Sequence, residues 1–294
     1  MNAPIIAIIG PTATGKSDLA LEIAKKHNCE IVSADSWLVR KYVDIGTAKP
    51  TLNMRQEVPH YLIDVVEPDE DFSAAAYKEL ALKAILDIQK REKVPLLVGG
   101  TGLYIDAILY DFSFAGESDP RMRQRLNNLS LDELHQMARS KGLDLSQIDV
   151  RNKRRVIRLI ESEGKVATKK ELRPNTLIIG LSSPLDLIKR RIEERVKQMI
   201  AQGLEDEVKS LSDQYGWSCE ALKGIGYSEW QLYFNHKQSL EETQKRIIKD
   251  SIDLAKRQIT WFKRNLSIHW YPTPVNIANV DELITTFLNN YVSL

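Results

Sequence analysis

An eight-residue stretch near the amino terminus limits the possible folds of this chain more than any other feature. Residues 10–17 read Gly-Pro-Thr-Ala-Thr-Gly-Lys-Ser and fit G-x-x-x-x-G-K-[ST], the pattern of a phosphate-binding loop. The apolar run 5–9 precedes the loop, and a segment with an apolar helical stripe (19–24) follows it. This strand–loop–helix context predicts a turn whose backbone N–H groups, at a helix N-terminus, hold phosphate oxygens.

Every residue of this loop is a candidate for phosphate binding. Lys16 supplies a positive charge, and the Ser17 hydroxyl can ligate Mg²⁺. A glycine-rich turn that binds no phosphate is the alternative, and the full match in its context argues against it. The phosphate-binding candidates are Gly10, Pro11, Thr12, Ala13, Thr14, Gly15, Lys16 and Ser17.

Two further strand-like segments end on polar groups. Residues 30–35 form a short apolar strand that ends on Asp35, and the apolar run 95–100 ends in two glycines before Thr101. Strand, helix and strand in this order predict a parallel sheet with right-handed crossovers. Because ligands bind at the carboxyl ends of such strands, we expect Asp35 beside the loop; a purely local capping role is the alternative. The predicted fold class is therefore α/β, with a P-loop NTPase-like parallel sheet flanked by helices.

The composition excludes some classes of protein. With 294 residues, 43% of them hydrophobic, the chain can form one large domain, or a core with a smaller one. It contains no run of 18 apolar residues, so we predict no transmembrane helix and no membrane partner. Neither a signal-peptide pattern nor a disulfide framework is visible in the sequence. We expect a cytoplasmic, monomeric protein.

A basic segment interrupts the sheet pattern. Between Arg121 and Pro174 there are 14 Lys/Arg residues against 7 Asp/Glu, although the whole chain carries only +1. The segment is helical in pattern, and strand signals return at 176–181. We therefore predict a basic helical insertion domain at 116–174, within a catalytic core formed by 1–115 and 175–294. Such charge asymmetry is typical of a protein with a polyanionic partner.

The strongest cluster of positive charge lies within the insertion. Arg151, Arg154, Arg155 and Arg158 occur at i, i+3, i+4 and i+7, so a helix would place them on one face. Four like charges repel one another unless a polyanion meets them, although a solvated charged face is the usual alternative. A second series of lysines (249, 256 and 263) repeats every seven residues after a predicted capping box at 239–242.

From the residues alone, the first hypothesis is a small-molecule kinase, because a phosphate loop followed by an acid at the next strand is its layout. The large basic insertion argues against a metabolite kinase, since its charge suits the backbone of a nucleic acid. A non-enzymatic nucleic-acid-binding module would not need Lys16, Ser17 and Asp35 together.

Several ordered blocks resemble the tRNA dimethylallyltransferase (isopentenyl-tRNA transferase) family, bacterial type. These blocks are the phosphate loop, Asp35-Ser36, residues 44–50 (Asp-Ile-Gly-Thr-Ala-Lys-Pro), 59–60, 97–101 with 103–104, 226–227 and 255–261. The resemblance implies transfer of a dimethylallyl group from dimethylallyl diphosphate to N6 of the adenosine 3′-adjacent to the anticodon (position 37) in tRNA. An adenylate isopentenyltransferase, which uses a free nucleotide, is a related alternative.

The resemblance also implies residue roles. The loop would hold the diphosphate with Mg²⁺ on Ser17, Lys16 would stabilise the leaving group, and Asp35 would accept the proton of the amine. Thr101 would lie close to the target base. The other implied positions are Ser36, Trp37 and Leu38 at the adenosine, Lys223 near the diphosphate, and Arg123, Arg154, Arg155 and Arg158 on the tRNA anticodon stem-loop. Relatives carry other residues at positions 37, 38 and 40, where this chain has Trp37, Leu38 and Arg40.

Overall fold

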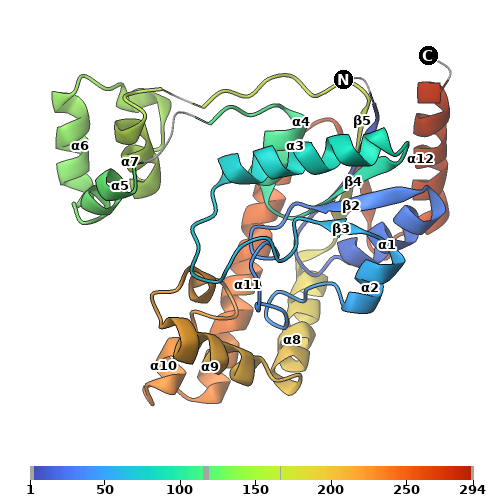
Figure 1. Cartoon of the computed structure of the whole chain (residues 1–294). Helices are drawn as coiled ribbons and strands as arrows, with labels where there is room; N and C mark the ends of the chain where they lie inside the picture. Colours follow the sequence, from blue (N-terminus) through green and yellow to red (C-terminus); the bar gives the residue numbers. More distant parts are fainter. Residues whose placement is uncertain (1–2, 115–118, 166, 293–294) are drawn as a thin grey trace. The chain divides into compact units, whose positions relative to one another are not determined.

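The computed structural model describes residues 3–114, 119–165 and 167–292, which form two compact units. The first unit, called the core, comprises Met1–Leu109 and Leu172–Leu294. The second, called the insertion unit, comprises Tyr110–Glu171. Both are drawn in Figure 1. None of the helices in the described ranges combines the length and the apolar character that crossing a bilayer requires.

The core is built on a six-stranded, wholly parallel sheet in the order β3-β2-β4-β1-β5-β6. The strands are β1 (Ile5–Ile9), β2 (Cys29–Ser33), β3 (His60–Tyr61), β4 (Val94–Gly99), β5 (Thr176–Ser182) and β6 (Ile268–Pro272). Strand β1 pairs with β4 on one side and β5 on the other, and all five of its residues are buried. The loop that follows β1 therefore begins at the middle of the sheet. The predicted α/β class is confirmed.

Helices cover both faces of this sheet. One face packs against α1 (Lys16–Lys26) and α12 (Ile277–Val292), which share an apolar cluster with β1 and β5. The other face packs against α3 (Ala74–Lys90), which also contacts α4 (Gly102–Leu109) (Figure 1). Ser73 caps α3 by accepting a hydrogen bond from the Ala76 N–H. The two layers bury the hydrophobic strands that the sequence pattern predicts.

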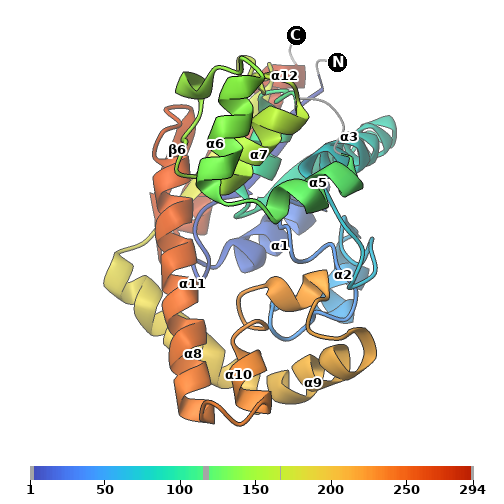
Figure 2. The ribbon, with the colours of Figure 1, turned by 90° about the vertical axis from the view of Figure 1, so that its left-hand side faces the viewer.

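The carboxyl-terminal half of the core adds a second apolar cluster. It joins α8 (Leu185–Ala201), α9 (Leu204–Tyr215), α10 (Trp230–Phe234) and α11 (Leu240–Phe262), which Figure 2 shows together. The capping box predicted at the start of α11 is present. A short helix, α2 (Leu52–Glu57), completes the core. Helices α8 and α11 contact each other and, as described below, both reach the phosphate loop.

The insertion unit has its own apolar centre. It contains α5 (Pro120–Asn127), α6 (Leu131–Ser140) and α7 (Lys153–Glu161), which bury Leu126, Leu134, Ala138, Val156, Ile157 and Ile160 among them. Its bounds differ from the expected 116–174, because the segments before and after the helices pair. The Ser113 N–H donates to the Thr168 carbonyl (2.8 Å), and the Lys170 N–H donates to the Tyr110 carbonyl (2.9 Å).

The predicted helix face with four arginines is wrong in one respect. Helix α7 begins at Lys153, and Asn152 caps it by accepting hydrogen bonds from the N–H groups of Arg154 and Arg155. Arg151 therefore lies before the helix, where its guanidinium pairs with Asp149 at 3.2 Å. Asparagine is a strong N-cap residue, and here it makes the helix begin at Lys153, two residues later than the basic pattern suggests.

Candidate active site

The backbone of the phosphate loop needs glycine at both ends. At Gly10, φ is +148°, and a Cβ atom would lie 2.7 Å from the Leu181 carbonyl oxygen. At Gly15, φ is +82°, a left-handed conformation, and α1 begins at the next residue. Side chains rarely adopt such φ values, so these two glycines are required by the loop conformation itself. The loop thus leads directly from β1 into the N-terminus of α1.

Lys16 lies inside this loop rather than pointing into solvent. Its Nζ donates a hydrogen bond to the Pro11 carbonyl (2.7 Å), and the Thr14 hydroxyl donates to the same oxygen (2.8 Å). Burial lowers the pKa of Lys16 to about 8; the negative charge of Asp35 opposes this effect, and the positive charge of Arg195 adds to it. The three charged groups therefore interact within one site.

Helix α8 supplies two cations to the loop that the sequence interpretation did not assign. The Arg195 guanidinium donates to the Thr12 hydroxyl (3.4 Å) and to the Thr47 carbonyl (3.0 Å). Burial lowers the pKa of Arg195, and Asp35 counteracts that shift. One turn earlier, Arg191 donates to the Ala13 carbonyl (3.3 Å). Because two residues four apart share a helix face, their spacing was the available signal.

Helix α11 contributes a neutral bridge. The Gln258 Oε1 atom accepts a hydrogen bond from the Thr12 N–H (2.8 Å), and its Nε2 donates to the Gly100 carbonyl (3.1 Å). A Cβ atom at Gly100 would lie 2.3 Å from the Gln258 amide, so glycine makes room for the bridge. Gln258 therefore connects the phosphate loop with the turn that carries Thr101.

The carboxyl ends of β2 and β4 meet directly. The Thr101 N–H donates to the Ala34 carbonyl (3.1 Å), and the Thr101 hydroxyl accepts a hydrogen bond from the Ser36 N–H (3.1 Å). The Asp35 Oδ1 atom accepts a hydrogen bond from the Trp37 N–H (2.8 Å), which orients the carboxylate. The structure thus brings Asp35, Ser36 and Thr101 together, as the strand order requires.

Two buried tyrosines lie within electrostatic reach of Asp35. The rings of Tyr77 and Tyr104 stack with centroids 3.7 Å apart, and the Tyr77 hydroxyl donates to the Ser33 carbonyl (3.0 Å). Burial raises the pKa of Tyr104 to about 12, and the charge of Asp35 adds to this shift. Both phenols therefore stay protonated at neutral pH.

The segment 44–50 is held rigidly beside the site. The Glu207 carboxylate of α9 accepts hydrogen bonds from the N–H groups of Asp44, Ile45 and Gly46, at 2.8–3.1 Å. The buried Lys49 amine pairs with Asp44 (2.5 Å) and with Asp64 (2.6 Å). These contacts fix the conformation of segment 44–50, whose Thr47 carbonyl accepts a hydrogen bond from Arg195.

Trp37 and Arg40, two of the positions at which relatives carry other residues, contact each other. Arg40 is 6% exposed; its guanidinium lies 5.9 Å from the Trp37 ring centre and donates to the Glu70 carbonyl (2.6 Å). Trp37 also packs against Gly224, where a Cβ atom would approach its ring to 2.9 Å. The adjacent Leu38 accepts a hydrogen bond from the Asp64 N–H through its carbonyl.

Three of the residues expected to bind phosphate groups or RNA form ion pairs with carboxylates of the protein itself. Lys223 pairs with Glu220, and no contact between Lys223 and the phosphate loop is found among the described residues. In the insertion unit, Arg123 and Arg158 both pair with the buried carboxylate of Glu161. This acid lies just beyond the basic run 151–158, which is why the run alone suggested unpaired charge. Arg154 and Arg155 are exposed.

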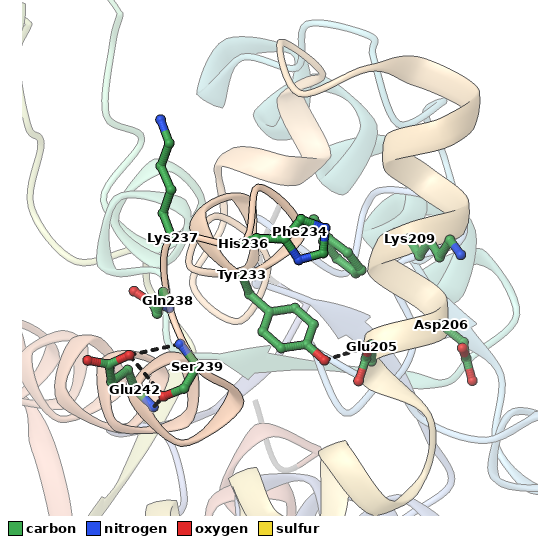
Figure 3. Close-up of a pocket in the computed structure, with 10 residues that line it drawn as sticks. All are labelled: Glu205, Asp206, Lys209, Tyr233, Phe234, His236, Lys237, Gln238, Ser239 and Glu242. Carbon is green, nitrogen blue, oxygen red and sulfur yellow. Dashed lines mark hydrogen bonds between the residues drawn. The ribbon is translucent and has the colours of Figure 1, made fainter.

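A cavity of about 710 Å³ lies elsewhere in the core, between α9, α10 and the start of α11 (Figure 3). The Tyr233 hydroxyl donates to Glu205 (3.0 Å) across it, and the Ser239–Glu242 capping box forms part of its wall. None of the predicted site residues lines this cavity. Its polar groups serve helix packing and capping.

Comparisons with known proteins agree with this arrangement. The model of the family described as IPP transferase matches residues 38–265. The tRNA dimethylallyltransferase of Bacillus licheniformis is 39% identical over 308 residues, covering 99% of this chain and 98% of the relative. That of Pediococcus pentosaceus is 42% identical over 282 residues, covering 91% and 90%.

A solved structure extends the likeness to the fold. The full-length tRNA isopentenylpyrophosphate transferase from Bacillus halodurans superposes with a TM-score of 0.77 at 35% identity, covering 99% of this chain and 98% of that one. Sequence and fold agree over the whole length of the chain, and this chain therefore belongs to the IPP transferase family, the family of the tRNA dimethylallyltransferases.

Proposed function

We propose that this protein transfers a dimethylallyl group from dimethylallyl diphosphate to N6 of the adenosine at position 37 of tRNA, next to the anticodon. One observation carries the proposal. A cationic phosphate loop, with Lys16 and Arg195, shares an electrostatic environment with Asp35, the carboxylate at the next strand end. Donor phosphates and acceptor proton would therefore be handled side by side, and the family relatives are named for this reaction.

The loop would bind the leaving group. As the bond between the allylic carbon and the diphosphate oxygen breaks, negative charge grows on the diphosphate. Lys16, Arg195 and the loop N–H groups are positioned to stabilise that charge in a partly buried site, where electrostatic interactions are stronger than in water. Arg195 would add a cation to the diphosphate site, for which the resemblance implies Lys223.

Mg²⁺ fits this site. It is usually held by few protein groups together with phosphate oxygens and water, and the exposed Ser17 hydroxyl in the first turn of α1 is such a group. When bound, the ion would add positive charge to the diphosphate and favour its departure. No cluster of three acidic, His or Cys side chains that could hold a metal occurs in the described ranges, consistent with a ligand set completed by substrate.

Asp35 would act on the acceptor. An adenine amine is a weak nucleophile because its lone pair is delocalised, so removal of a proton during attack assists the reaction. The new bond joins N6 to the allylic carbon, the carbon–oxygen electron pair leaves with the diphosphate, and the N6 proton passes to Asp35. Oδ1 already accepts the Trp37 N–H, which leaves Oδ2 to receive that proton. Thr101 would lie close to the target base.

tRNA is the acceptor that best fits the charge distribution. Arg154 and Arg155 are exposed on the insertion unit, and we assign them to the backbone of the anticodon stem-loop. Arg123 and Arg158 would contact RNA only through groups not used by Glu161. We further infer that the enzyme acts as a monomer, because Lys16, Asp35, Arg195 and Gln258 all come from one chain, and that it works in the cytoplasm, where tRNA is available.

The test mixes the protein with dimethylallyl diphosphate, Mg²⁺ and either an unmodified tRNA transcript or AMP. Mass spectrometry of the digested RNA should find prenylated adenosine only in the tRNA arm. A transcript with guanosine in place of the target adenosine is the matched control and should stay unmodified. Prenylated AMP with unmodified tRNA would instead identify an adenylate isopentenyltransferase. No transfer to either acceptor would refute the proposal.

A further inference from the structure

A groove lies at the carboxyl ends of β5 and β6; its lining includes Pro11 but neither Asp35 nor Thr101. Its volume is about 670 Å³, within the range of about 300–1,000 Å³ that is typical of small-ligand sites. The apolar part of its lining includes Leu181, Ile259 and Trp270, while Lys256 and Lys263 are its charged members. No acidic side chain lines it within the described part of the core.

One buried polar group in the groove lacks a partner. Ser183 lines it, and its buried hydroxyl oxygen has no hydrogen-bond partner among the described residues. Buried polar atoms are nearly always hydrogen-bonded, so an unpaired one indicates a missing partner. The 17-residue helix α8 begins beside it at Leu185, and Pro184 provides no side-chain cap. A ligand that accepts a hydrogen bond would satisfy the Ser183 hydroxyl.

The two lysines of the groove favour an anionic ligand. Lys263 is exposed, and Lys256 is exposed and pairs with Asp253 at 2.9 Å. Lys256 lies on α11, and Lys263, seven residues later, caps the helix in a helical backbone conformation, so both project from the same side. Lys249 belongs to the same repeat but lies outside the lining of the groove. Of the three lysines in the repeat, only the last two, Lys256 and Lys263, line the groove.

Trp270 gives the groove an aromatic wall. It is 38% exposed on the edge strand β6, paired in register with Gly180 of β5. A Cβ atom at Gly180 would lie 2.7 Å from the indole, so the glycine provides the space that the ring occupies. An exposed indole next to two lysines offers a stacking surface and phosphate contacts together, the combination that holds single-stranded nucleic acids.

We propose that this groove binds one nucleotide of single-stranded RNA, with its base stacked on Trp270 and its phosphate between Lys256 and Lys263. The Ser183 hydroxyl donates a hydrogen bond to the same phosphate. The choice of RNA rests on the proposed function, in which tRNA is the acceptor. The nucleotide is not the one that is modified, because neither Asp35 nor Thr101 lines the groove. It would help hold the tRNA loop on the core.

A uridine trimer carrying 5-iodouridine tests the proposal without donor or catalysis. Ultraviolet irradiation should crosslink the trimer to the peptide that contains Trp270. In equilibrium binding, Trp270→Ala and Lys263→Glu should each lower the affinity for the trimer about fivefold or more. Stacking on an aromatic side chain contributes about 1–3 kcal/mol per base. Lys249→Glu, with the same charge change on the same helix, should alter the affinity less than about twofold. Trp270→Phe should retain part of the binding.

Three results would overturn the proposal. They are crosslinks only at other aromatic residues, an affinity that Lys263→Glu leaves unchanged, and displacement of the trimer by inorganic phosphate as effectively as by UMP. The last would indicate a simple anion site. Lys16→Ala separates this proposal from the function: it should abolish transfer while the trimer binds as before. Trimer binding without transfer in the native protein would refute only the function.

Discussion

The charges around the phosphate loop depend on one another through a partly buried space. Burial lowers the pKa values of both Lys16 and Arg195, and Asp35 opposes each shift. In the ligand-free protein the two cations therefore repel each other and are only partly compensated by one carboxylate. A diphosphate would relieve this repulsion, because it brings several negative charges to the same place. The site is thus arranged to favour a polyanion over water.

The lowered pKa of Lys16 makes donor binding dependent on pH. Its pKa is about 8 instead of 10.5, so the free protein loses this charge as the pH rises through 8. We expect the affinity for dimethylallyl diphosphate to fall about tenfold per pH unit above this value. Equilibrium binding between pH 7 and 10 measures it. Lys16→Arg, which stays charged, should remove the inflection, and an unchanged inflection in this variant would exclude Lys16 as its source.

The same shift predicts a stability effect of opposite direction. Between about pH 8 and 10.5 the unfolded chain retains the Lys16 proton that the folded protein has released. Because the unfolded state then binds more protons, the contribution of Lys16 to the free energy of unfolding increases with pH over this interval. Below pH 8 the folded protein bears the full cost of holding the buried ammonium. Activity and stability therefore respond to Lys16 in opposite ways.

Asp35→Asn tests the proposed base with little change in shape. The asparagine Oδ1 atom can still accept the Trp37 N–H, so the turn should be preserved. An amide cannot take up the N6 proton, and we expect transfer to fall by about 10²–10⁴-fold, the usual contribution of a general base. tRNA and donor affinities, measured separately, should stay within about threefold of the native values. Undiminished single-turnover transfer would remove Asp35 from this role.

Helices distant in sequence complete the site, and α11 shows how. Gln258 spans from the Thr12 N–H to the Gly100 carbonyl, and so connects the ends of β1 and β4. It occupies a loop N–H group that a phosphate would otherwise use. Its contribution is therefore to hold the loop in one conformation relative to Thr101. In the same way, Arg195 of helix α8 connects Thr12 of the phosphate loop with the segment 44–50.

Gln258→Met should expose this positioning role. Methionine keeps the length of the side chain but loses both hydrogen bonds, each of which contributes about 0.5–1.5 kcal/mol. We expect kcat to fall about tenfold and KM for the donor to rise, with the helix itself intact. Gln258→Glu keeps the acceptor for the Thr12 N–H but adds negative charge beside the diphosphate, so it should raise KM for the donor more than Gln258→Met does. Arg257→Met, on the neighbouring exposed position, is the control. Equal kinetics in all three variants would contradict the role.

Local patterns predicted the sheet and its ligand-binding edge, and long-range pairing explains what they missed. The phosphate loop, Asp35 and Thr101 each follow a strand, so parallel topology alone places them at one edge. Arg195 lies in an amphipathic helix of mixed charge, where its spacing from Arg191 puts both on one face but does not tell a site-facing side from a solvated one. The pairing of Arg123 with Glu161, 38 residues apart, likewise depends on the tertiary structure. The pairs of Arg158 with Glu161 and of Lys223 with Glu220 are instead local i,i+3 pairs, which the sequence contains.

The proposed reaction places the chemistry in the core and the grip on the anticodon stem-loop in the insertion unit, and charge reversal can test this role of the insertion unit. Replacing Arg154 and Arg155 together with Glu should weaken tRNA binding. It should also reduce the slope of log affinity against log salt by about 2, because each lost phosphate contact contributes about 0.9. Donor binding should be unaffected, since the phosphate loop belongs to the core. Native-protein titrations across a salt series provide the reference.

The matched control reverses Arg139 and Lys141, which are exposed in the same unit. The net charge of the insertion unit changes equally in both double variants, so a difference between them reports contact and not the overall field. If both variants lose the same affinity and slope, the unit attracts tRNA only by its charge. If only the reversal of Arg154 and Arg155 lowers the affinity and the slope, the first turn of α7 binds the backbone of the anticodon stem-loop. Asn152 then has a functional consequence, because by starting α7 it places both guanidinium groups on the first exposed turn.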